Sequence, residues 1–160
     1  MREISSLFQF GIRKSTFAVG AMAMALAGCH DTPGFYPNQD VALRKPIGNY
    51  RMDAARRTYP ADAPRVRGLA ARSQIGYVVK AVDVANLSDE DWNEVEVWVN
   101  KQYVCYLPRM EKGVLKSIPF DALYDGDGHH VPTGSRTFIV ETVEVFFGGK
   151  LYDMPVRVAY

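Results

Sequence analysis

The side chains most able to bind a metal ion lie in one loop, written YDGDGHHVPTGS. The loop contains Asp125, Asp127, His129 and His130. Carboxylates separated by glycine can curl around Ca²⁺, and adjacent histidines can reach a transition metal such as Zn²⁺. An EF-hand loop that began at Asp125 would need a bidentate acid at its last ligand position, where Arg136 stands, so that motif is excluded. Gly, Asp and Pro at this density are also what any long turn requires, so the sequence predicts an ordinary loop, with a metal site as the alternative.

A second candidate site is an aromatic pair beside a carboxylate. In the stretch WVNKQYV, a two-residue Asn-Lys turn would set Val99 opposite Gln102. That register makes Trp98 and Tyr103 directly opposed, with Glu96 on the same face. If exposed, these side chains could stack on a sugar ring or dock a partner. If a second sheet or the N-terminal segment covers them, they need no ligand, and this is the main interpretation because an aromatic cross-strand pair contributes stability by itself.

Motifs for nucleophilic or hydrolytic catalysis are missing from the sequence. It contains no GxSxG, no HExxH, no glycine-rich phosphate loop and no CxxC. Cys105 has no activating residues next to it in the chain, so we interpret it as a small apolar strand residue, although the register above leaves it partly reachable. The sequence therefore predicts a protein that is not an enzyme.

The first residues have the layout of a secretory signal. A positively charged start, with Arg2, Arg13 and Lys14, precedes the apolar run TFAVGAMAMALA and the small residues before Cys29. A helix needs about 20 apolar residues to span a bilayer, and this run is shorter. Residues 1–28 are therefore predicted to be a signal peptide that takes no part in the fold.

The end of this leader resembles a known processing signal. Leu26, Ala27, Gly28 and Cys29 resemble, position for position, the lipobox of bacterial lipoproteins. The resemblance implies lipid on the Cys29 sulfur, cleavage after Gly28 and a fatty acid such as palmitate on the new amino terminus. Each buried methylene contributes ~0.8 kcal/mol, so two or three chains would hold the protein durably. Where two membranes exist, an aspartate after the cysteine favours the inner one; His30 follows here, which favours the outer membrane.

The chain that begins at Cys29 is close to neutral, but its charge is unevenly distributed. Residues 30–73 hold eight Arg or Lys against four Asp, and residues 74–160 hold eight against thirteen acids. Residues 29–73 also contain five prolines and no sustained period, which predicts an irregular tether with at most a short helix near RMDAARR. Its arginines would be solvated or would contact anionic headgroups: Arg44, Arg51, Arg56, Arg57, Arg65, Arg67 and Arg72. The near-neutral charge gives no reason to expect nucleic acid as a partner.

Residues 74–160 contain alternating patterns of β-branched and aromatic residues, and turn residues interrupt these patterns at short intervals. This predicts an antiparallel β-sandwich, and the texture resembles immunoglobulin-like sandwiches of secreted proteins, without the antibody cysteine pair. In FFGGKLY a glycine turn sets Phe147 opposite Lys150, and therefore Glu144 opposite Asp153. Opposed acids destabilise a ladder. Either a bulge shifts the register, or a cation or arginine lies between the acids, or both reach water; we favour the bulge.

Together these features predict a lipid-anchored protein of the bacterial cell envelope with one small β-sandwich domain. The domain would bind an envelope protein or polymer, and no cofactor is expected. One alternative is a metal-binding protein or metal-dependent hydrolase that uses Ca²⁺ or Zn²⁺ in the 125–130 loop. Another is a purely structural module in an envelope assembly.

Overall fold

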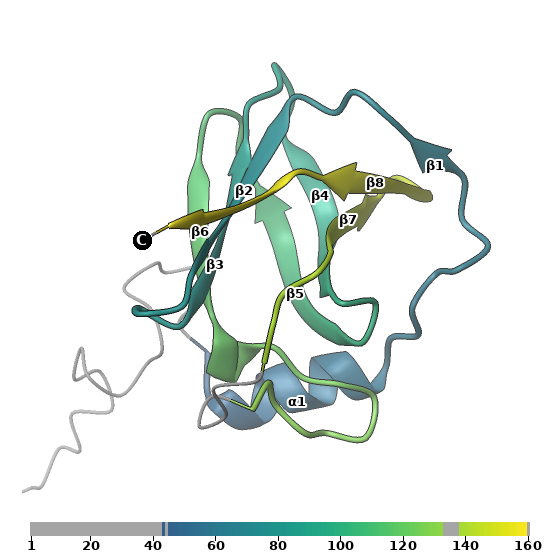
Figure 1. Ribbon diagram of the computed structural model, residues 1–160. Helices are drawn as coiled ribbons and strands as arrows, with labels where there is room; N and C mark the ends of the chain where they lie inside the picture. Colours follow the sequence, from purple (N-terminus) through teal and green to yellow (C-terminus); the bar gives the residue numbers. More distant parts are fainter. Residues whose placement is uncertain (1–42, 44, 133–137, 160) are drawn as a thin grey trace, which may run out of the picture.

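The computed structural model describes residues 43, 45–132 and 138–159, and these residues are mostly β (Figure 1). In this described part of the chain, nine strands form two sheets, accompanied by a short α-helix and a short 3₁₀-helix. The predicted all-β class is therefore confirmed for the described part of the chain. In chain order the elements are α1 (Ile47–Ala55), β1 (Arg65–Val66), β2 (Ala71–Gly76), β3 (Ala81–Asn86), β4 (Trp92–Val99), β5 (Tyr103–Met110), β6 (Leu115–Pro119), η2 (Phe120–Ala122), β7 (Val143–Phe147), β8 (Lys150–Met154) and β9 (Val156–Ala159).

Two strand pairs are parallel rather than antiparallel. The larger sheet has the order β1-β8-β7-β4-β5, and the smaller sheet has the order β6-β3-β2-β9. β1 runs parallel to β8, and β9 runs parallel to β2. Both pairs lie next to a crossing from the larger to the smaller sheet: β1 precedes the crossing to β2, and β9 follows the crossing at Pro155, whose carbonyl accepts a hydrogen bond from Ser73 Oγ at 2.7 Å. The predicted fully antiparallel pattern is wrong for β1 and β9.

One hydrophobic core joins the two sheets. It contains fully buried side chains from the smaller sheet, including Ile75, Val82 and Val84, and from the larger sheet, including Val95 and Val97. Side chains alternate between the two faces of a strand, so these residues define the inner face of each sheet. We call the other face of the larger sheet its outer face. It does not face the smaller sheet, and segments outside the two sheets can pack against it.

One of the two predicted hairpin registers is correct, and the other is wrong by one residue. Phe147 pairs with Lys150 across the glycine turn, as predicted. In the other hairpin Val99 pairs with Tyr103 instead of Gln102, because the connection is a three-residue turn whose first two residues have positive φ. A shift of one residue moves every side chain of β5 to the other face of the sheet.

The N-terminal segment is part of the fold and not a tether. Leu43 is fully buried, and residues 45–66, which we call the N-terminal strap, run along the outer face of the larger sheet and end by pairing with β8 (Figure 1). The predicted domain boundary at Gln74 falls inside β2. The prediction of an irregular tether over residues 29–73 is therefore wrong for its described part. The physical reason is that the basic strap meets an acidic sheet face.

Helix α1 forms with little help from local signals. Its N-cap residue makes no side-chain hydrogen bond, and its first turn has no acidic residue. Tertiary contacts stabilise it instead: Tyr50 and Ala54 are each 1% exposed, and the Tyr50 hydroxyl donates to the Leu43 carbonyl. Lys45 Nζ also lies 2.6 Å from Asp53 Oδ2. Packing of one face, more than helix propensity, stabilises a helix this short.

Candidate functional site

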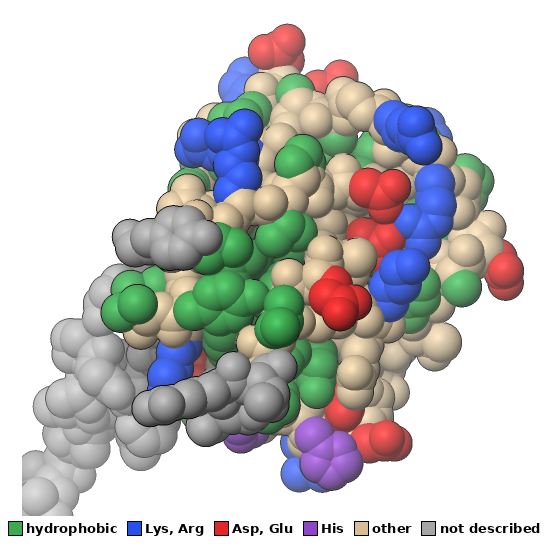
Figure 2. All heavy atoms as spheres, viewed as in Figure 1, with side chains coloured by type: hydrophobic (Ala, Val, Ile, Leu, Met, Phe, Trp, Pro, Cys, Tyr) green, Lys and Arg blue, Asp and Glu red, His purple; other side chains and the backbone are tan. Residues whose placement is uncertain are grey.

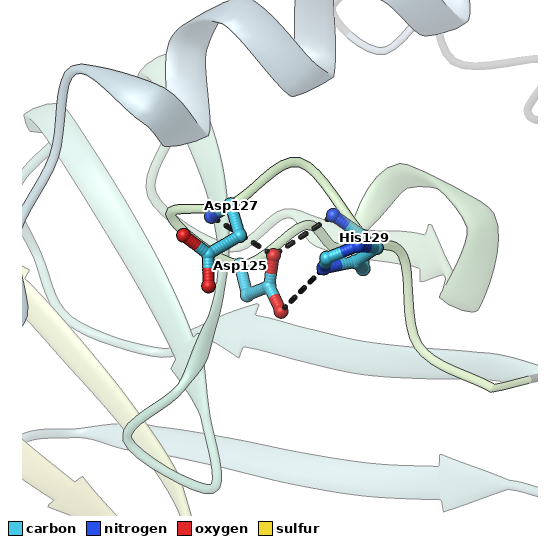
Figure 3. A group of neighbouring side chains, drawn as sticks. All are labelled: Asp125, Asp127 and His129. Carbon is cyan, nitrogen blue, oxygen red and sulfur yellow. Dashed lines mark hydrogen bonds and ion pairs between the residues drawn. The ribbon is translucent and has the colours of Figure 1, made fainter.

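Three of the four predicted metal ligands converge in the loop after η2 (Figure 3). Asp125, Asp127 and His129 each offer a ligand atom, and these atoms lie within 4.8 Å of one another. His130 is not in this group, since its Nδ1 lies 2.7 Å from the Val131 carbonyl oxygen. The cluster has the mixed oxygen and nitrogen donors that a divalent cation accepts.

The Asp125 carboxylate also organises the loop without an ion. Its Oδ1 accepts hydrogen bonds from the backbone N–H groups of Asp127 at 3.1 Å and His129 at 2.8 Å. Its Oδ2 lies 3.5 Å from His129 Nδ1. Burial by itself would raise the pKa of Asp125, but these backbone donors and the nearby His129 outweigh burial and hold the pKa below its ordinary value of 3.8.

Helix α1 fixes the loop from its other side. Gly128 has a φ of 83°, and a Cβ at this position would lie 2.3 Å from Arg51 Nε of α1. A larger residue would therefore be strained in its backbone and would also displace the arginine. The strap and the loop are thus in contact, and the glycine permits that contact.

We expect Asp125→Ala to lower the free energy of unfolding by about 1–2 kcal/mol near neutral pH, because two backbone donors lose their acceptor. Asp125→Asn keeps an acceptor and should lose less. Because the folded-state pKa lies below 3.8, the carboxylate contributes its full stabilisation above that pH and loses it as the pH falls through the folded value. Urea unfolding of the three proteins, at neutral and at acidic pH, checks this. A wild-type advantage over Asp125→Ala that persists unchanged in acid would contradict it.

Trp98 and Tyr103 do not form the predicted aromatic pair. Trp98 pairs with Val104 and lies on the outer face of the larger sheet, whereas Tyr103 lies on the inner face. Both are buried, with 2% and 9% of their surfaces exposed. Only Glu96 shares a face with Trp98, and its Oε2 accepts a hydrogen bond from Trp98 Nε1 at 3.0 Å. The predicted joint site is therefore wrong, because the register differs by one residue.

The same register buries Cys105. Its side chain faces the core and is 1% exposed. Burial raises the pKa of the Cys105 thiol to about 12, so the reactive thiolate is scarce at neutral pH. The predicted partial accessibility of this thiol is wrong.

The N-terminal strap covers the outer face with aromatic and cationic side chains. The Tyr59 ring meets the Trp98 ring edge-on, with centroids 5.4 Å apart. The Arg57 guanidinium lies 3.8 Å from the centroid of the Tyr106 ring, and its Nε lies 3.2 Å from Glu96 Oε1. These contacts occupy the surface that, if exposed, could have stacked on a sugar ring.

Arg65 separates the opposed acids of the last hairpin. Glu144 pairs directly with Asp153, and the register continues through β7 and β8 without a bulge. Arg65 Nη1 lies 2.5 Å from Glu144 Oε1 and 2.8 Å from Asp153 Oδ1, and the Tyr59 hydroxyl donates to Glu144 Oε2 at 2.7 Å. The hydrogen bond to Glu144 is the main cause that raises the pKa of Arg65. An arginine between the acids is thus the correct explanation, and the favoured bulge is wrong.

Two of the arginines predicted to be solvated or to contact lipid headgroups are therefore used inside the fold. Arg57 and Arg65 neutralise acids that lie 39 and 79 residues further along the chain. Arg51, Arg56, Arg67 and Arg72 remain exposed, and Arg44 lies outside the described residues. The excess of bases before residue 74 and of acids after it was the one sequence signal that could have indicated this pairing.

A hollow of about 400 Å³ lies beside this network and was not predicted. Arg65, Glu144 and Asp153 line one part of it, and Lys101 and Glu141 line another. Its walls come from segments that are distant in the sequence, so no local motif marks it. The exposed Lys101 and Glu141 offer charges of both signs to a small polar ligand.

Comparison with known proteins assigns no family. No family model, curated protein or solved structure matches the chain. Among the residues that the structure describes, no helix is long and apolar enough to cross a membrane. Residues 1–42, which include the lipobox and Cys29, lie outside the described residues.

Proposed function

We propose that the protein is a bacterial envelope lipoprotein, held in the membrane by lipid on Cys29, that presents a small β-sandwich as a binding or structural module. The observation that carries this proposal is the tetrapeptide from Leu26 to Cys29, directly after a charged start and a short apolar run. His30 supports the outer membrane where two membranes are present. The partner would be an envelope protein or polymer.

The fold supports a module that binds rather than reacts. In this proposal the two sheets, which share one core, form an immunoglobulin-like β-sandwich. The parallel pairs β1-β8 and β2-β9 differ from the antiparallel pairing of the simplest sandwich of this type. The one described cysteine, Cys105, is buried and poorly ionised, which argues against its use as a nucleophile. The hollow beside Arg65 is the place where such a module would hold a small polar group of its partner.

Because the strap is part of the fold, only a short stretch of chain separates the proposed lipid anchor from the folded module. Leu43 follows Cys29 by only 14 positions, and a chain of that length reaches about 50 Å when fully extended. An anchored module would therefore act close to the bilayer surface.

Replacement of Cys29 tests the anchor. We expect Cys29→Ala to leave the membrane fraction after a salt wash, because without the acylated sulfur no lipid chain holds the protein. The matched control is Cys105→Ala, which changes the buried cysteine and should stay with the membrane. A Cys29→Ala protein that remains in the washed pellet, or mature wild-type protein whose mass shows an unmodified thiol, would end the proposal.

A metal-binding role is the second candidate, favoured by the convergence of Asp125, Asp127 and His129. It requires that Ca²⁺ or Zn²⁺, at about 100 times its dissociation constant, raise the free energy of unfolding by ~2.7 kcal/mol. Asp127→Asn is the matched control, because this exposed side chain can lose its charge without loss of the Asp125 hydrogen bonds that hold the loop. Thermal unfolding of both proteins with each metal decides the question: no metal-dependent shift in the wild type excludes the site.

A further inference from the structure

An exposed apolar hairpin tip lies in the turn between β2 and β3. Val78 is 89% exposed and Val79 is 72% exposed, and Lys80 follows them with a φ of 54°. Turns usually carry Gly, Asn, Asp or Ser, so two adjacent valines are not what the turn itself requires. Hydrophobic side chains also gather on the face seen in Figure 2. Exposed apolar side chains that cluster in this way mark a surface for a partner or a membrane.

This tip lies at the end of the molecule where the chain enters the fold. The Phe120 N–H of η2 donates to the Lys80 carbonyl at 2.8 Å, and the rings of Phe120 and Tyr77 are 6.3 Å apart. η2 in turn contacts α1, whose first residue, Ile47, is 45% exposed. We call the 77–80 turn, η2 and the start of α1 the anchor-side end.

We propose that the anchor-side end docks on the lipid bilayer, with Val78 and Val79 inserted among the lipid headgroups. This inference rests on the proposed lipid at Cys29. An anchor 14 positions before Leu43 keeps this end within about 50 Å of the bilayer. Apolar side chains inserted at the headgroup boundary, with a lysine at the surface, are a common means by which proteins lie on membranes. The turn Tyr77–Lys80 contains no acid that anionic headgroups would repel, and the one acid of η2, Asp121, is only partly exposed.

A fluorescent label tests the docking in the lipidated full-length protein. A cysteine introduced at Val78 or at Leu87 is the one reactive thiol, because the Cys29 sulfur carries lipid and Cys105 is buried. Leu87 is the matched control: it is 54% exposed and follows the opposite end of β3. The protein is bound to vesicles of phosphatidylethanolamine and phosphatidylglycerol, and iodide is added as a water-soluble quencher. We expect the Stern–Volmer quenching constant to be at least about five-fold smaller for the label at residue 78 than for the label at residue 87.

The outcomes separate this inference from the proposed function. Protein that floats with the vesicles but is quenched equally at both positions overturns the docking alone. Protein that does not float with the vesicles overturns both proposals. A second variant tests the valines themselves: with Val78→Ser and Val79→Ser, a label at Ile47→Cys should become as accessible as the label at residue 87. A label at residue 47 that stays protected in that variant would overturn the role of the valines.

Discussion

A chain that begins at Gln74 should fail to fold, although the sequence alone indicated that the β domain starts there. Such a chain lacks Leu43 and the strap, and it lacks the first half of β2. Loss of one large buried apolar side chain costs about 2–5 kcal/mol, and the total stability of a domain is only about 5–15 kcal/mol. Loss of Leu43, Tyr50 and Tyr59 together is therefore enough to unfold the protein.

The missing half of β2 adds a second cause. β2 lies between β3 and β9, and its pairing with β9 begins at Ser73. The strap also supplies Arg65, and without it Glu144 and Asp153 would be opposed in the ladder without the arginine that lies between them. Directly opposed like charges destabilise a strand pair.

Circular dichroism and urea unfolding check this prediction. The matched control is a chain that begins at Val41, which keeps the whole described fold and should unfold cooperatively with the stability of the longer protein. If the chain from Gln74 unfolds with the same midpoint as this control, the strap is not part of the domain.

Trp98→Ala should lower the free energy of unfolding by about 3–5 kcal/mol, the usual cost of a large aromatic side chain lost from a core. Trp98 lies on the central part of the larger sheet, where Tyr59 of the strap meets its ring and Glu96 accepts from its indole nitrogen. The variant removes the apolar surface on which the strap lies, so the strap should open before the sheets do. Trypsin should then cut after Arg57 and Arg65 faster than in the wild type.

Trp98→Phe is the matched control for this variant. It keeps an aromatic ring against Tyr59 and loses only the donor to Glu96, so we expect it to retain most of the stability. The contradicting result is a Trp98→Ala protein that loses less than about 1 kcal/mol with unchanged cleavage of the strap, since an exposed Trp98 would behave in that way.

Local patterns in the sequence determined the β class, the glycine hairpin and one cluster of side chains. The alternation of β-branched and aromatic residues reports on strands directly, and the Gly-Gly pair specifies a tight turn, so Phe147 opposite Lys150 was predicted correctly. Asp125, Asp127 and His129 are close in the sequence, and one loop brings them together in the structure. Residues this near to each other need no tertiary contact to meet.

Tertiary structure alone decided which residues share a face with Trp98, which cation pairs with Glu144, and that the N-terminal strap has an ordered conformation. A turn with one more residue than predicted moved Tyr103 to the inner face, because side chains alternate with period two. Arg65 and Glu144 lie 79 residues apart, and the uneven charge of the chain does not specify which arginine meets which acid at that distance. The N-cap residue of α1 makes no side-chain hydrogen bond and the sequence of the strap has no strand alternation, so contacts with an acidic, aromatic sheet face hold the strap in place.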